Sequence, residues 1–140
     1  MRWGSTVDNK LPLTLTDCLH IEVPAVPFRE LATEDRGEAS EGIRSRVLAA
    51  RSIQTQRYQE SRSHSNAQLR PGQLRKYCRL DGPGRALIEQ AVTRLGLSAR
   101  AYMRIIKVAR TIADLNGSCG ISSAHVAEAV QYRSLDRPLS

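Results

Sequence analysis

Residues 98–117 read SARAYMRIIKVARTIADLNG, and this stretch predicts an amphipathic helix at the centre of the protein. When the stretch is turned as an α-helix, one side is apolar and is expected to be core: Tyr102, Ile105, Ala109, Ile112 and Ala113. The opposite arc is basic: Arg100, Arg104, Lys107 and Arg110. Ser98 is the expected N-cap, and Asn116-Gly117 is the expected end of the helix.

Two further helices are predicted on either side of this one. Asp81 begins the first, Gly96 ends it, and its expected buried face is Leu87, Ile88, Ala91, Val92 and Leu95. Ser122 caps the second, which runs to about Tyr132. Connections this short favour helices that pack as direct neighbours.

The region before residue 80 also reads as helical. A helix is predicted over residues 41–59, with Ser40 as N-cap and with an apolar stripe of Ile43, Val47 and Ala50. A short helix is predicted from Pro71 to Tyr77, because proline is favoured in the first helical turn. The predicted fold class is therefore all-α, a small helical bundle.

The N-terminal region lacks helical periodicity. Residues 1–17 are expected to be a flexible leader, and Leu19–Val23 alternates like a short strand that Pro24 and Pro27 stop. Since a single strand needs a partner, we interpret it as the vestigial end of a larger domain. The predicted domains are residues 1–37, comprising leader, strand remnant and linker, and residues 38–137, the helical domain.

Composition limits the classes of partner and compartment. The formal charge of +7 favours anionic partners, although a basic surface also serves solubility. The three cysteines, Cys18, Cys78 and Cys119, form no close pair and are expected to be small buried hydrophobes in a reducing cytoplasm. No apolar run reaches about 18 residues, so no membrane association is expected. The histidines lie far apart without metal-ligand spacing, so no metal is expected.

Arg100 is the residue that the sequence singles out for chemistry. A cation in the first turn of a helix is unfavourable unless an anion accompanies it, because free backbone N–H groups and the helix dipole are already positive there. A guanidinium can hold two phosphate oxygens at once. Pairing with a surface carboxylate, or exposure to water alone, is the alternative expectation for Arg100.

Several runs of sequence resemble one known family. LGLSARAYMRIIKVARTIADLNG and HVAEAVQYRSLDR are similar to the C-terminal lid of the magnesium chelatase subunit I family, and in particular to its bacterial competence-associated branch. SRVLAARSIQTQRY and NAQL resemble the start of that lid, and LHIEVPAV resembles the strand that closes the AAA+ ATPase core before it. The resemblance covers residues 19–137 in order.

The resemblance implies a role for the start of the central helix. In such ATPases an early lid arginine, called sensor 2, reaches the γ-phosphate of ATP, and the run Ser98-Ala99-Arg100 would place that role on Arg100, with Ser98 beside it. ATP and magnesium would be cofactors of a complete family member only. No GxxxxGK[ST] loop and no apolar strand ending in Asp-Glu occur here, so the chain is not expected to be an enzyme. The family's Asp-Arg pair is replaced by Leu15-Thr16, so its trans-acting arginine is missing.

The expected partners are an AAA+ core or neighbouring ring subunits, and the isolated chain is expected to be a monomer. A second hypothesis is a DNA-binding module, because helices 83–95 and 98–115 resemble a helix-turn-helix in outline. In that case Arg104, Lys107 and Arg110 would contact phosphates. A third is an assembly module that binds AAA+ subunits without a core of its own.

Overall fold

The computed structural model describes residues 37–133 together with Leu19, Ile21, Val23, Ala25 and Phe28. Within this part of the chain the elements are α2 (Ser40–Arg57), η1 (Asn66–Gln68), α3 (Pro71–Tyr77), α4 (Gly82–Leu95), α5 (Ala99–Leu115) and α6 (Ser123–Gln131). The all-α prediction is confirmed. Residues 1–18, with the predicted leader, and residues 134–140 lie outside the described residues.

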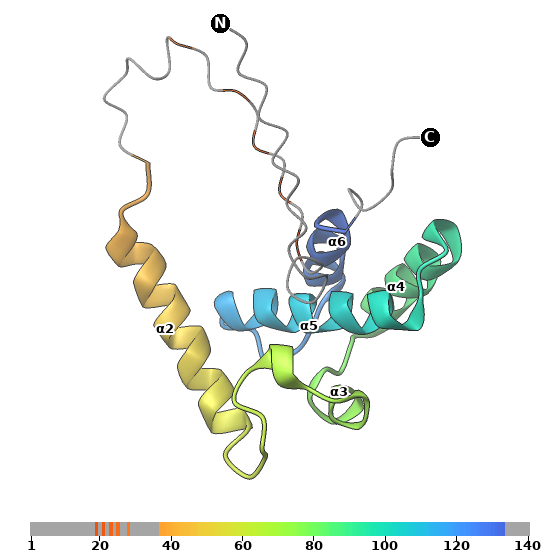
Figure 1. Ribbon diagram of the computed structural model, residues 1–140, viewed down its shortest axis with the longest axis horizontal. Coiled ribbons are helices and arrows are strands. Elements are labelled where there is room, and N and C mark those ends of the chain that lie inside the picture. The colour runs from red at the N-terminus through yellow and green to blue at the C-terminus, as the bar shows by residue number, and fades with distance from the viewer. Residues whose placement is uncertain are drawn as a thin grey trace, which may run out of the picture.

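Helix α5 is the central element of the bundle. In Figure 1 it crosses the molecule, with α2 beside its C-terminal end, α6 on one side, and η1 and α3 on the other. Its apolar side packs against these neighbours, so that Ile105, Ala109 and Ala113 have no exposed surface. Helix α4 packs mainly against α6 and makes fewer contacts with α5.

The predicted helix ends are largely confirmed, because they depend on local chemistry. The Asp81 carboxylate accepts a hydrogen bond from Gly84 N at 2.7 Å, and Ser98 Oγ accepts one from Ala101 N at 3.2 Å. Gly96 ends α4 in the left-handed conformation, with φ of 59°. Ser122 caps α6 as expected. Ser40 is not an N-cap, however, since it is the first helical residue and makes no capping hydrogen bond.

The predicted buried faces are less accurate. On α2, Ile43 is 45% exposed and Val47 is similarly exposed, while Ala50 is buried. Only the later part of α2 reaches η1 and α5, so no described residue covers the start of the stripe. On α4, Ile88 alone of the predicted face is fully buried, since this helix packs mainly against α6. Tyr102 is 39% exposed because it lies at the edge of a cleft between α3 and α4.

The strand predicted at Leu19–Val23 is not observed. The residues of that stretch that the structure describes, Leu19, Ile21 and Val23, belong to no regular element and are exposed. No strand among the described residues offers them a backbone partner, and a strand without one is unstable. The end of the predicted domain at residue 137 lies outside the described residues, so that boundary stays a prediction.

The cysteines differ from one another in environment. Cys78 is buried as predicted, and burial raises the pKa of its thiol to about 11. Cys119 is exposed, contrary to the prediction, because it lies in the loop between α5 and α6. Within the described residues no helix is long and apolar enough to cross a membrane. In the same part of the chain, no group of three or more potential metal ligands is found.

Candidate phosphate-binding site and its supports

Arg100 is the second residue of α5 and lies two positions after the N-cap, Ser98. Ser98 Oγ satisfies one of the free N–H groups of the first turn, and Arg100 itself is exposed. The Arg100 side chain makes no hydrogen bond or ion pair with any residue that the structure describes. Of the two alternative expectations, a surface carboxylate beside Arg100 is not found in this part of the molecule, whereas exposure of Arg100 to water is what the structure has.

Lys107 and Arg104 lie on the same arc of α5 as Arg100 but in a different environment. Lys107 Nζ donates a hydrogen bond to the Ala67 carbonyl at 2.8 Å, which ties α5 to η1. Both residues line a mainly apolar cavity of about 480 Å³, to which Val108 and Tyr132 also contribute. Lys107 therefore has a structural contact that the sequence did not predict.

Arg110 is not a surface residue. Its side chain is 2% exposed and donates to the carbonyls of Ser118 at 2.7 Å and Cys119 at 2.9 Å. The chain turns back after Gly117, which has a φ of 66°, and so brings these carbonyls over the helix. The prediction that Arg110 contacts phosphate or nucleic acid is therefore wrong.

Asp114 is the centre of a buried polar cluster that sequence reasoning missed. Its carboxylate accepts hydrogen bonds from Arg57 at 2.5 and 2.8 Å, from Asn66 Nδ2 at 2.9 Å and from Arg110 Nε at 3.1 Å. Burial alone raises the pKa of Asp114, but the hydrogen bonds from Arg57 and Asn66 and the charges of both arginines lower it overall. The same carboxylate raises the pKa of Arg57, so the cluster is ionised. The i,i+4 spacing of Arg110 and Asp114 is the one sequence signal that could have revealed a part of this cluster.

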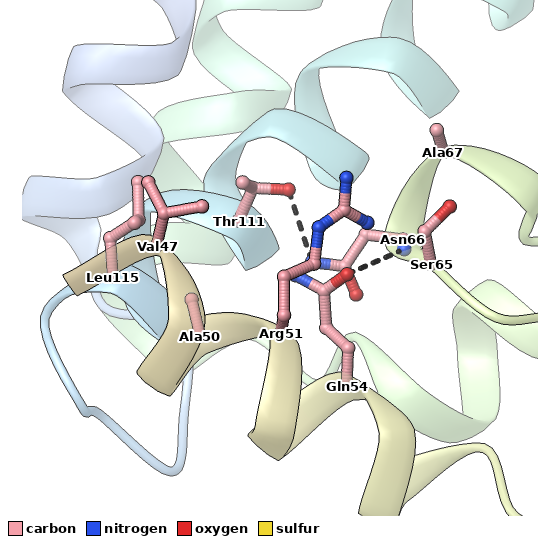
Figure 2. A pocket seen from close by; sticks show the side chains of 9 residues that line it. All are labelled: Val47, Ala50, Arg51, Gln54, Ser65, Asn66, Ala67, Thr111 and Leu115. Carbon is pink, nitrogen blue, oxygen red and sulfur yellow. Dashed lines mark hydrogen bonds between the residues drawn. The ribbon is translucent and has the colours of Figure 1, made fainter. Parts of the chain in front are cut away.

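Asn66 joins this cluster to α2. A cavity of about 290 Å³ lies between α2, η1 and α5, and Figure 2 shows Asn66 among the residues that line it. Asn66 Nδ2 donates to Thr111 Oγ1 at 3.0 Å, and Asn66 N donates to Gln54 Oε1 at 3.4 Å. Tyr58 Oη donates to the Asn66 amide oxygen at 2.6 Å. The short η1 segment therefore holds the end of α2 against α5.

At the start of α6, His125 makes a structural contact. His125 is buried, and its Nδ1 accepts a hydrogen bond from Ser122 N at 3.1 Å. This contact belongs to the cap of α6. His125 therefore stabilises a helix end.

Residues 37–133, which include all the described helices, match the family described as magnesium chelatase, subunit ChlI C-terminal, and the chain belongs to that family. Over 122 residues, 86% of this chain, it is 44% identical to the competence protein ComM of Haemophilus influenzae. It is 40% identical over the same length to the uncharacterized protein YifB of Escherichia coli. The chain spans 23% of the length of each of these relatives. The resemblance to the competence-associated branch is thereby confirmed.

Proposed function

We propose that this chain acts as the lid of a magnesium-chelatase-like AAA+ ATPase and that Arg100 is its phosphate-contacting arginine. The observation that carries the proposal is the exposed guanidinium of Arg100, without a partner among the described residues, at the Ser98-capped start of α5. The chain would not catalyse hydrolysis itself. ATP and magnesium would be bound by an ATPase core, which is the partner that the proposal requires.

The start of α5 has the chemistry that a nucleotide phosphate needs. The free N–H groups of the first turn and the positive end of the helix dipole favour an anion, and the Arg100 fork adds two donors. A guanidinium that reaches the γ-phosphate stabilises the charge of the transferring phosphoryl group. It also couples that charge to the position of the lid, as closing segments do in many enzymes.

The structure gives the DNA-binding hypothesis less support than the sequence alone gives it. It requires Arg104, Lys107 and Arg110 to form one basic surface, but Arg110 is buried against Asp114. Lys107 is bonded to the Ala67 carbonyl. The outline of a helix-turn-helix remains, with α4 and α5 joined at Gly96-Leu97, but such turns are common in helical bundles.

We expect Arg100→Ala to reduce ATP hydrolysis at least about tenfold in a complete ATPase of this family whose own lid is replaced by this chain, since the loss of one charge-stabilising donor costs that much or more. The rate is measured from phosphate release. Arg94→Ala is the matched control, because Arg94 is also exposed and lies in the last turn of α4. Equal rates for Arg100→Ala and Arg94→Ala would contradict the proposed role.

A second measurement tests the phosphate contact directly. Adding the ATP analogue AMPPNP with magnesium to the 140-residue protein should shift the backbone amide resonances of residues 97–104, and Arg100→Ala should weaken those shifts. Duplex DNA is the competing ligand. Widespread shifts with DNA and none with AMPPNP would favour the DNA-binding hypothesis instead.

A further inference from the structure

The cleft at whose edge Tyr102 lies, between α3, α4 and α5, is lined by three arginines. Arg75 belongs to α3, Arg79 to the link between α3 and α4, and Arg85 to α4. The cleft has a volume of about 620 Å³, within the range of pockets that enclose a ligand. Three separate segments of the chain therefore bring an arginine each to one cleft.

Three other arginines of the fold are paired with a carboxylate, and the cleft arginines differ from them in this respect. Arg46 is paired with Glu38, and Arg57 and Arg110 share Asp114. The side chains of the cleft arginines make no hydrogen bond or ion pair with any described residue. The only carboxylate among the residues that line the cleft is Glu89. The rim thus has an excess of positive charge that favours an anionic ligand.

The floor of the same cleft is apolar. Leu74, Ile88 and Ile106 line it and are buried, and Leu80 is partly buried beside them. Tyr102, at the edge, contributes the only aromatic ring among the lining residues. A ligand that fits would place an apolar group on the floor and anionic groups at the rim.

The cleft is separate from the proposed phosphate site. Tyr102 follows Arg100 by two residues, which is a turn of about 200° around the axis of α5. Arg100 and the cleft therefore lie on opposite sides of this helix. Binding in the cleft is independent of the role proposed for Arg100.

We propose that this cleft binds an acidic peptide segment of a protein partner, with an aliphatic side chain on the floor and carboxylates paired to Arg75, Arg79 and Arg85. The arginine fork matches a carboxylate in a bidentate geometry. A nucleic-acid strand is disfavoured because single-stranded binding depends on aromatic rings, and this floor is aliphatic apart from one tyrosine.

The test uses a fluorescein-labelled nine-residue peptide in which one leucine is flanked on each side by Asp and Glu, with binding to the whole chain followed by anisotropy. The variant Arg75→Gln/Arg79→Gln/Arg85→Gln should weaken binding at least about tenfold, which corresponds to about 1.4 kcal/mol. Arg44→Gln/Arg51→Gln/Arg94→Gln is the matched control, because it also removes three charges and these arginines are exposed and do not line the cleft. Circular dichroism of each variant establishes that the helices are retained.

Three further probes decide between ligands. A peptide with Asn and Gln in place of the acids should bind more weakly, and so should an acidic peptide with glycine in place of leucine. A single-stranded oligonucleotide of equal charge should bind more weakly than the acidic peptide. Tighter binding of the oligonucleotide, or equal binding of the peptide to the triple variant and the unmodified protein, would overturn the proposal. Arg100→Ala should leave peptide binding unchanged, which separates this result from that of the proposed function.

Discussion

Replacing Asp114 with alanine should lower the free energy of unfolding by about 3–5 kcal/mol, the range found when one partner of a buried ion pair is removed. The substitution leaves Arg110, which is 2% exposed, without its carboxylate, and it also removes the acceptor of Arg57 and Asn66. Urea denaturation followed by circular dichroism measures the change. A loss of less than about 1 kcal/mol would mean that the cluster does not hold α2 and η1 on α5.

Acidification provides a second measurement of the same carboxylate. The pKa of Asp114 is lower in the folded protein than in the unfolded chain. Its contribution is therefore fully present above the unfolded value of about 3.9 and is lost as the pH falls through the folded value. The unmodified protein should lose more stability below about pH 4 than Asp114→Ala does. Parallel stability curves for the two proteins would contradict the ionised cluster.

The parts of the fold that sequence predicted well depend on neighbours in the chain. Asp81 and Ser98 cap helices through N–H groups three residues away, and Gly96 supplies the left-handed residue that ends α4. Such signals are complete within a few residues. The boundaries of α3 to α6 therefore followed closely from the sequence.

The parts that sequence missed depend on residues far apart in the chain. Asp114 meets Arg57, which lies 57 positions earlier, and no local pattern links the two. Arg110 lies at the border of the basic arc, and its burial depends on how the loop after Gly117 folds back. Helical periodicity gives the direction in which a side chain points, but not whether another segment covers it.

The residues of the candidate sites also divide into those with a local sequence signal and those that depend on the tertiary structure. Arg100 could be selected from sequence, because its position after an N-cap is a local feature. The cleft arginines, Arg75, Arg79 and Arg85, carry no distinguishing local signal. They meet only because α3, the following link and α4 fold around the start of α5. A binding surface built from several segments needs the tertiary structure before it can be recognised.

Ile105 and Ile43 both lie on the predicted apolar side of a helix, but only Ile105 is buried. Ile105→Ala should lower the free energy of unfolding by about 2–5 kcal/mol, because Ile105 has no exposed surface and its truncation leaves a cavity. Ile43→Ala should change it by less than about 0.5 kcal/mol, because Ile43 is 45% exposed on α2. Both variants remove the same atoms from a helix, so urea denaturation isolates the effect of packing. A large loss in Ile43→Ala would show that the start of α2 is covered in solution by a part of the protein outside the described residues or by a second copy. A dependence of that loss on protein concentration would identify the second copy, because only an intermolecular contact responds to concentration.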